Sequence, residues 1–398
     1  MVSTTLLALW GLVPPALAGF LANSHNNIAI YWGQNSANRP NSQQRLATYC
    51  TDTPVNIIPI AFLHSIKSPT LLNFANAGDN CTVFPSTQLL SCPEIESDIQ
   101  TCQSLGKTVL LSLGGATYTE GGFASPSEAT RWADTLWAMF GPRQPSSTVP
   151  RPFGSAVIDG FDFDFEDPTQ NMAVFAARLR TLMDNSPGRR RYFLSAAPQC
   201  PFPDHAMDEI LQGVKLDFVS IQFYNNYCGA PAFLPGVNAV QNNFNLGTWD
   251  RWARTAPNPG VKVLVGIPGS PSAAGSGYVT AQRLGEVLGY ARRYASFGGV
   301  MVWDMSQVEA NGGFLDGVEG ALRGVGGHGG GSESAGAAPV PVPVPGPAVP
   351  PAPVPVPAAG EGGVPQWGQC GGKGYGGPTG CQAPYTCVHQ SEWWAHCN

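Results

Sequence analysis

Residues 157–166 read Val-Ile-Asp-Gly-Phe-Asp-Phe-Asp-Phe-Glu, and aromatic and acidic side chains alternate strictly from Phe161 to Glu166. Such alternation is typical of a β-strand, because successive side chains point to opposite faces. The strand would place Asp162, Asp164 and Glu166 on one face and three phenylalanines on the other. Carboxylates held side by side repel one another and are costly to desolvate, so neither a core nor an ordinary surface favours them.

A row of carboxylates has three common explanations. It can perform acid–base chemistry, with one carboxyl kept protonated by its neighbours. It can bind a divalent cation, or it can be a solvated face of a strand. The interleaved phenylalanines argue against solvation on both faces, since they need a hydrophobic layer to pack on. A metal site stays open from this strand alone.

The composition narrows the classes of protein that the chain can be. Charged residues make up 12% of 398 residues, the formal net charge is −6, and no basic run occurs, which argues against a nucleic acid partner. Residues 5–18 are apolar and end in Ala16-Leu17-Ala18, as a signal peptide does before its cleavage site. No later apolar run is long enough to span a membrane. We therefore expect residues 1–18 to be a signal peptide and the protein to be secreted, with no membrane partner.

The cysteines agree with an oxidising compartment. There are 10 of them, an even number, so all could be paired. None is spaced as C-x-x-C, so a structural zinc site has little support, and we expect neither a metal nor a cofactor. Asn80-Cys81-Thr82 fits an N-glycosylation sequon, and the sequence leaves its occupancy open.

A change of composition divides the chain. Residues 324–363 are rich in glycine and then in Pro-Val and Pro-Ala repeats, which favour extended polyproline II and predict a semi-rigid linker. The linker separates a large domain at 19–323 from a tail at 364–398. A tail of this size is too small to fold without disulfide or similar cross-links.

Eight buried-strand patterns recur in residues 19–323, with helical or loop segments between them. They lie at 27–32, 55–62, 108–113, 157–166, 191–197, 218–223, 262–266 and 299–303. Helical spacing of apolar residues occurs at 127–140, 171–183 and 281–296. The pattern predicts an α/β fold, a (β/α)₈ barrel. Glu166 would then lie at the C-terminal end of the fourth strand, where barrel enzymes place their chemistry.

Several motifs in the predicted barrel carry a family resemblance. Residues 159–166 resemble the DGxDxDxE signature of the family-18 glycoside hydrolases, the chitinases. Residues 112–115 resemble the SxGG motif of that family, and residues 29–35 are similar to the opening of plant and fungal class III chitinases. Residues 196–204 and 222–226 resemble the ends of the fifth and sixth strands. The resemblance covers about residues 25–320, in the family's order.

The resemblance implies a retaining, substrate-assisted hydrolysis of β-1,4-linked N-acetylglucosamine. Glu166 would be the general acid, and the carbonyl of the substrate's own 2-acetamido group would be the nucleophile, giving an oxazolinium ion. Asp164 would hold the acetamido N–H, and Asp162 would share a proton with Asp164. Tyr224 would orient the acetamido oxygen.

The resemblance also implies substrate-binding roles for Tyr31, Gln222, Asn225 and Trp303, with Trp303 beneath the sugar at the cleavage site. Tyr31 and Gln222 are explained equally well as ordinary inward-facing barrel residues. Asp159 fits better with the start of the strand or barrel packing than with catalysis. By the same resemblance the disulfides of this domain would be Cys50–Cys102, Cys81–Cys92 and Cys200–Cys228, which the sequence alone could not choose.

The tail resembles the fungal-type family-one carbohydrate-binding module over its whole length. That pattern implies the disulfides Cys370–Cys387 and Cys381–Cys397. Its flat aromatic face would consist of Trp367, Trp393 and Trp394, stacked on a polysaccharide, with a hydrogen bond from Gln369. Burial of three indoles as core is disfavoured, because so small a domain has little core.

The sequence therefore predicts a secreted, monomeric chitinase that acts on chitin and chito-oligosaccharides. The alternatives are a non-catalytic chitin-binding lectin and an endo-β-N-acetylglucosaminidase acting on glycoprotein glycans. The intact set of Asp162, Asp164 and Glu166 argues against a lectin, and the polysaccharide-binding tail argues against a glycoprotein substrate. A cellulase is disfavoured because cellulose has no acetamido group, although the tail alone does not choose between chitin and cellulose.

Overall fold

The computed structural model describes residues 19–188, 190–236, 241, 243–324, 363–364, 369–371, 379–391 and 394–397. The chain divides into two units, Met1–Gly330 and Gly331–Asn398. The predicted signal peptide and nearly all of the predicted linker lie outside the described residues. In the part of the chain that is described, no helix combines the length and apolar character that crossing a membrane requires.

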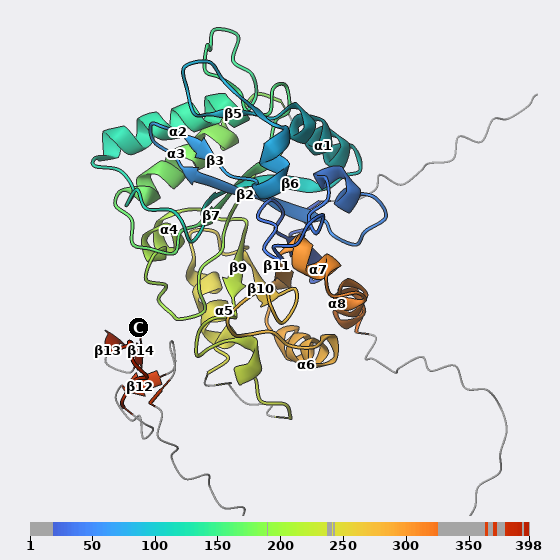
Figure 1. The fold of residues 1–398 in the computed structure, drawn as a ribbon, viewed down its shortest axis with the longest axis vertical. Coiled ribbons are helices and arrows are strands. Elements are labelled where there is room, and N and C mark those ends of the chain that lie inside the picture. The colour runs from blue at the N-terminus through green and yellow to red at the C-terminus, as the bar shows by residue number, and fades with distance from the viewer. Residues whose placement is uncertain are drawn as a thin grey trace, which may run out of the picture. The chain divides into compact units, whose positions relative to one another are not determined.

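Eight parallel strands close into a barrel in the first unit (Figure 1). Closure comes from β1 (Asn27–Ile30), which pairs with both β2 (Ile57–Ser65) and β11 (Phe297–Trp303). The strands between them are β6 (Thr108–Gly114), β7 (Gly160–Asp164), β8 (Phe193–Ala196), β9 (Phe218–Gln222) and β10 (Lys262–Pro268). All eight overlap the predicted segments, which confirms the predicted (β/α)₈ barrel. A short strand, β3 (Leu71–Leu72), pairs antiparallel with β2 outside the barrel.

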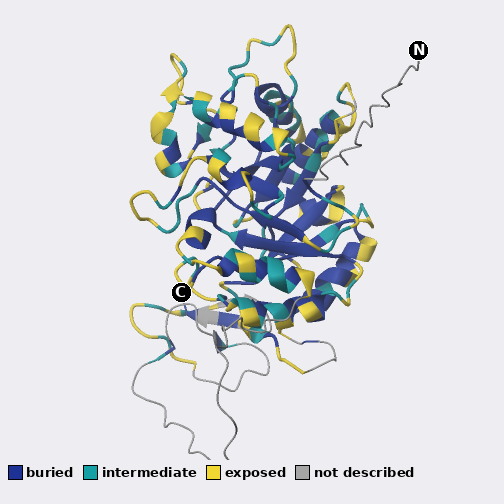
Figure 2. Cartoon of the chain, turned by 90° about the vertical axis from the view of Figure 1, so that its right-hand side faces the viewer, coloured by how far each residue is buried: buried dark blue, intermediate teal, exposed yellow. Residues whose placement is uncertain are grey.

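Helices cover the outside of the barrel, with their exposed residues on the solvent side and the strands buried beneath (Figure 2). They are α1 (Pro93–Ser104), α2 (Pro126–Phe140), α3 (Met172–Asp184), α4 (Asp208–Gly213), α5 (Leu246–Thr255), α6 (Ala281–Ala291), α7 (Met305–Glu309) and α8 (Phe314–Arg323). The helix predicted at 281–296 is therefore shorter than expected. Short 3₁₀ helices are η1 (Leu46–Cys50), η2 (Ala75–Asn80) and η3 (Ala230–Ala232).

Three disulfides fasten loops of the barrel. Cys50–Cys102 joins η1 to α1, and Cys81–Cys92 closes the hairpin of β4 (Thr82–Val83) and β5 (Leu90–Ser91). Cys200–Cys228 joins the loops that follow β8 and β9. These are the pairs that the resemblance implies.

The phenylalanines of β7 face outward, into the layer between strands and helices. Phe161, Phe163 and Phe165 are all buried. The Phe161 ring lies 6.3 Å from that of Trp137 on α2, and the Phe163 ring lies 6.5 Å from that of Phe175 on α3. Because side chains alternate along a strand, this packing turns the acidic side chains of β7 toward the barrel axis.

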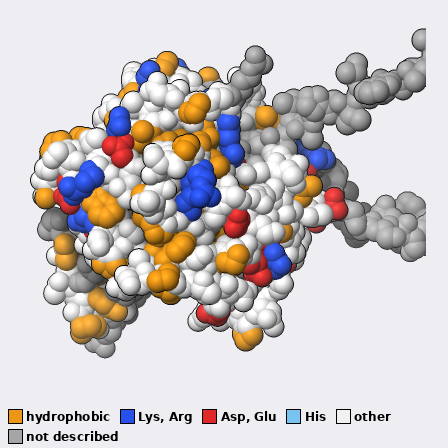
Figure 3. All heavy atoms as spheres, turned by 90° about the horizontal axis from the view of Figure 1, so that it is seen from above, with side chains coloured by type: hydrophobic (Ala, Val, Ile, Leu, Met, Phe, Trp, Pro, Cys, Tyr) orange, Lys and Arg blue, Asp and Glu red, His pale blue; other side chains and the backbone are white. Residues whose placement is uncertain are grey.

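Phe20 closes the N-terminal end of the barrel. Its ring centroid lies 5.4 Å from that of Phe193 and 4.7 Å from that of Phe218, the first residues of β8 and β9. Its backbone N–H donates to Oγ1 of Thr108, the first residue of β6, at 2.9 Å. The face of the molecule drawn in Figure 3 has its basic and acidic side chains scattered among uncharged atoms, with no basic patch among the described residues drawn there.

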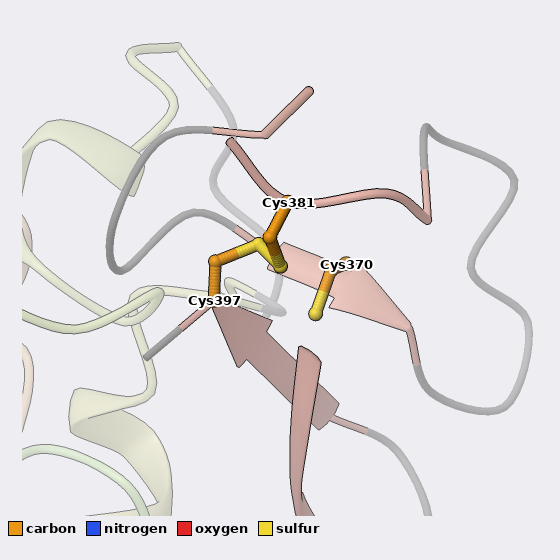
Figure 4. A group of neighbouring side chains, drawn as sticks. All are labelled: Cys370, Cys381 and Cys397. Carbon is orange, nitrogen blue, oxygen red and sulfur yellow. A yellow bond between two sulfur atoms is a disulfide. The ribbon is translucent and has the colours of Figure 1, made fainter. Parts of the chain in front are cut away.

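The second unit contains a small antiparallel sheet in the order β12 (Gln369–Gly371), β14 (Trp394–Cys397), β13 (Cys387–Ser391). The disulfides are Cys370–Cys387 and Cys381–Cys397, as the resemblance implies, so the group of cysteines drawn in Figure 4 consists of disulfide sulfurs and not of free thiolate ligands. The predicted platform residues Trp367 and Trp393 lie outside the described residues. Gln369 and Trp394 are placed only by their backbone, in β12 and β14.

Replacing Phe20 by alanine should destabilise the barrel by about 3 kcal/mol, because a buried aromatic ring is lost and a cavity remains. Urea unfolding followed by circular dichroism measures this change. The matched control is Leu105→Ala at a 43% exposed position, which should change the free energy of unfolding by less than about 0.5 kcal/mol. Equal stability of the Phe20→Ala variant and the wild type would contradict the account of the closed barrel end.

Candidate active site

Asp162 lies inside the barrel and accepts hydrogen bonds from three hydroxyl groups. Oδ2 accepts from Tyr31 Oη at 2.7 Å and from Ser112 Oγ at 2.7 Å, and Oδ1 accepts from Ser195 Oγ at 2.6 Å. Burial raises the pKa of Asp162, while these hydrogen bonds oppose the rise because they stabilise the charged form. Donors from β6, β8 and the end of β1 therefore hold this carboxylate rigidly in place.

Asp164 is the second carboxyl on the inner face of β7, and only 4% of it is exposed. Its Oδ1 accepts from Nε2 of Gln222, at the end of β9, at 2.9 Å. Burial is the main cause that raises its pKa well above the usual range, followed by the charges of Glu166 and Asp162. Carboxyls this close titrate as a set, so the proton is shared among them.

Glu166 stands two residues beyond the end of β7 and is half-buried. Its pKa is raised by burial, and then by the negative charges of Asp167 and Asp204. A raised pKa keeps the proton on a carboxyl to a higher pH, which is the direction that favours a general acid. Glu166 also follows the C-terminal end of a barrel strand, where barrel enzymes place their chemistry.

Aromatic side chains surround these carboxyls. Tyr224 is the second residue after β9 and is buried. Its pKa is raised well above the usual range, first by burial and then by Asp164 and Glu166. It is therefore a neutral hydrogen-bond donor. Trp303 ends β11, with its ring 5.5 Å from that of Tyr31 and stacked at 5.8 Å on that of Phe62.

The other two predicted residues, Asn225 and Asp159, make contacts that join loops and strands. Asn225 is exposed, and it pairs with Ser276 through two hydrogen bonds of 3.1 Å each, from Asn225 N–H to the Ser276 carbonyl and from Ser276 N–H to Asn225 Oδ1. It thus joins the loops after β9 and β10. Asp159 accepts from the backbone N–H of Val109 at 2.9 Å and pairs with Arg190 at 2.6 Å, a structural role at the start of the strand.

Sequence reasoning missed three contributors to this site. Ser195 was read only as part of a buried strand, and Phe62 only as part of an apolar run, so neither carried a signal of its own. Asp204 appeared only as the end of a motif. The structure shows that it is 3% exposed and that its charge acts on Glu166 and Asp164.

The site agrees with the comparison of the chain with known protein families. Residues 27–278 match the family described as glycosyl hydrolases family 18. The chain belongs to this family. Residues 366–394 match the fungal cellulose binding domain.

The relatives of the chain span its barrel. "Endochitinase 33" of Trichoderma harzianum is 55% identical over 321 residues, which cover 80% of this chain and 99% of that protein. "Class III chitinase" of Arthroderma benhamiae is 48% identical over 322 residues, covering 79% of this chain and 91% of that protein.

Solved structures of the same fold include an enzyme and inhibitors. A chitinase from Ipomoea carnea superposes with a TM-score of 0.61 at 30% identity, covering 74% of this chain and 100% of that chain. A xylanase and α-amylase inhibitor protein from Scadoxus multiflorus superposes with a TM-score of 0.60 at 28% identity, covering 74% and 98%. The fold alone therefore does not decide the activity, which has to be inferred from the residues of the site.

The raised pKa of Asp164 predicts a specific pH dependence of stability. An unfolded chain releases this proton near the ordinary value, whereas the folded chain retains it, so the free energy of unfolding falls as the pH rises between the two. Asp164→Asn removes this loss while keeping an oxygen that accepts from Gln222. The difference in Tm between the variant and the wild type should therefore grow as the pH rises above about 4, the ordinary range of the group.

Differential scanning calorimetry across this pH range measures the effect. Asp134→Asn, at a partly exposed carboxylate on α2 that pairs with Arg178, is the matched control for the loss of an acidic side chain outside the barrel interior. A pH-independent difference for Asp164→Asn would show that burial of this carboxyl is not costly.

Proposed function

We propose that the protein is a secreted chitinase that hydrolyses β-1,4-N-acetylglucosamine linkages with retention of configuration. The observation that carries this proposal is the row of carboxyls along β7 and its end, in which Asp162 and Asp164 are buried and Glu166 has a raised pKa. The names of the two fungal relatives, an endochitinase and a class III chitinase, support the same activity.

In the first step, Glu166 donates its proton to the glycosidic oxygen as the bond from C1 to that oxygen breaks. The carbonyl oxygen of the 2-acetamido group on the same sugar attacks C1 and forms a cyclic oxazolinium ion. Asp164 accepts a hydrogen bond from the acetamido N–H, and its negative charge stabilises the positive charge that develops there. Tyr224, a neutral donor, holds the acetamido oxygen in line with C1.

In the second step, the Glu166 carboxylate takes a proton from water, and the water oxygen attacks C1 and opens the ring. Two displacements at C1 return the original β configuration. The proton that Asp164 holds in the free site passes to Asp162 before the first step, because the two carboxyls titrate together, and this leaves Asp164 negatively charged for that step. Tyr31, Gln222 and Trp303 line the sugar site, and Asn225 supports it from the neighbouring loop.

Two alternatives fit the molecule less well. A lectin or inhibitor of this fold would have no need of buried carboxyls that cost stability, whereas Asp162, Asp164 and Glu166 are all present here. An endo-β-N-acetylglucosaminidase acting on glycoprotein glycans would gain little from a module that binds insoluble polysaccharide. Both alternatives are therefore weaker than the chitinase.

The domain organisation follows from this function. We propose a signal peptide at 1–18, a catalytic barrel at 19–323, a linker at 324–363 and a binding module at 364–398, in a monomer that works outside the cell. The module would hold the barrel near insoluble chitin or cellulose and so raise its effective concentration there. Trp367, Trp393 and Trp394 would stack on the sugar rings, and Gln369 would add a hydrogen bond.

Replacing Glu166 by glutamine should lower kcat on colloidal chitin by about 10²-fold to 10⁴-fold or more, because the amide cannot donate the acid proton. Release of reducing ends measures the rate, and circular dichroism checks the fold. The matched control is Glu209→Gln, an exposed substitution on α4, which should leave the rate near that of the wild type. Wild-type activity in Glu166→Gln would refute the assignment of the acid.

Deleting residues 324–398 should weaken binding to crystalline chitin while leaving hydrolysis of short soluble oligomers nearly unchanged. The reason is that the module adds attachment to the solid but makes no contact with the reacting bond. Sedimentation of the protein with crystalline chitin measures binding, and a soluble chito-oligosaccharide assay measures turnover. Equal binding of the full and the truncated protein would contradict the role of the module.

A further inference from the structure

Asp204 is a buried carboxyl that the reaction above does not use. It lies in the loop between β8 and α4, with 3% of its surface exposed. Its Oδ2 accepts from the backbone N–H of Gln199 at 2.8 Å, and its Oδ1 accepts from those of Ala206 at 3.0 Å and Met207 at 2.7 Å. All three partners are donors, and donors stabilise the ionised form of a carboxyl. Burial raises the pKa of Asp204 above its ordinary value, and these three hydrogen bonds oppose that rise.

The loop that Asp204 fixes supports the end of β9. Gln199 forms an isolated bridge with Gln222, and its Oε1 accepts from Nδ2 of Asn226 at 3.0 Å. Gln222 in turn donates to Asp164 at 2.9 Å. A chain of direct contacts thus runs from Asp204 through Gln199 and Gln222 to the catalytic strand.

Two further links make this loop rigid. The backbone carbonyl of Pro198 accepts from the N–H of Gln222 at 2.8 Å, and the Cys200–Cys228 disulfide ties the same loop to the one that carries Tyr224. The position of Asp204 is consequently fixed relative to both walls of the site. Fixed charges of this kind act on a reaction without any cost of reorganisation.

The charge of Asp204 also reaches the acid. Two charges act on Glu166, those of the adjacent Asp167 and of Asp204 on the β8 loop, and the charge of Glu166 in turn acts on Asp164 and Tyr224. After burial, Asp167 and then Asp204 raise the pKa of Glu166. Asp167 is exposed, so solvent and salt screen its charge, whereas the charge of Asp204 is buried and screened much less. The effect of Asp204 on the pKa of Glu166 is therefore less sensitive to salt than the effect of Asp167.

We propose that Asp204 is a positioning residue of the reaction: its buried carboxylate fixes the loop after β8 against β9 and keeps the proton on Glu166. This inference rests on the proposed function. It gives a role to a buried carboxyl whose charge raises the pKa of both Asp164 and Glu166.

The test is the pH profile of kcat for Asp204→Asn. The amide has one acceptor oxygen, so it keeps either the bond from Gln199 or those from Ala206 and Met207, and the negative charge is gone. Glu166 should then lose its proton at a lower pH, and the alkaline limb of the pH profile should move to lower pH. The ratio of activity near pH 7 to activity near pH 5 should fall about threefold or more. Asp204→Glu, which restores the charge, should return the limb toward its original position.

The matched control is Asp217→Asn. Asp217 is also a buried carboxylate that accepts from a backbone N–H, that of Leu194 at 3.0 Å, and it pairs with Arg180 and Arg191 at the opposite end of the barrel strands. The Asp217→Asn substitution should lower the Tm without moving the alkaline limb of the pH profile. A folded Asp204→Asn variant with an unmoved limb would overturn the proposal and leave Asp204 a loop anchor only.

If Asp204→Asn does not fold, His205→Lys decides the question. His205 is exposed and its charge acts on Asp204, so a permanent cation there, measured at low ionic strength where screening is weakest, should move the limb in the same direction by a smaller amount. An unmoved limb in this variant also overturns the proposal. Failure of the proposed function would look different, because Glu166→Gln would then retain activity whatever Asp204 does.

Discussion

The rest of the structure depends on the cost of burying carboxyls on one strand. Asp162 and Asp164 lie inside the barrel, where desolvation and mutual repulsion oppose their charged forms. The barrel meets this cost with donors from several strands: the hydroxyls of Tyr31, Ser112 and Ser195, and the amide of Gln222. The phenylalanines on the other face of β7 hold the strand against α2 and α3. The site is therefore a strained electrostatic arrangement held by a well-packed shell, as is common for functional sites.

The barrel could be predicted from the sequence because its signal is local. Each strand is an apolar run with a length and spacing that a parallel sheet requires, and β7 adds an alternation that fixes which face is acidic. The boundaries were less accurate: the segment predicted at 157–166 forms a strand only at Gly160–Asp164, so Glu166 lies on the loop beyond it. This position suits a group that must exchange protons with substrate and water.

The surroundings of the carboxyls could not be predicted from local pattern. Ser195 and Phe62 look like any other buried residue of a strand. The register of β7 against β8 places the serine at Asp162, and closure of the barrel brings the phenylalanine to Trp303. The role of Asp204 is also hidden from local pattern, because it depends on a loop whose backbone N–H groups fold back on the carboxyl. The motifs identified the acid, whereas the groups that tune it come from strands and loops distant in sequence.

The central claim is that the substrate's own acetamido group is the nucleophile, aimed by Asp164 and Tyr224. The most direct measurement is to digest a partially N-acetylated chitosan and to identify the sugar at each new reducing end by mass spectrometry and NMR. That sugar occupied the site where C1 is attacked. The account predicts that essentially every new reducing end is N-acetylglucosamine. New reducing ends of glucosamine, at a frequency near its share of the polymer, would contradict it.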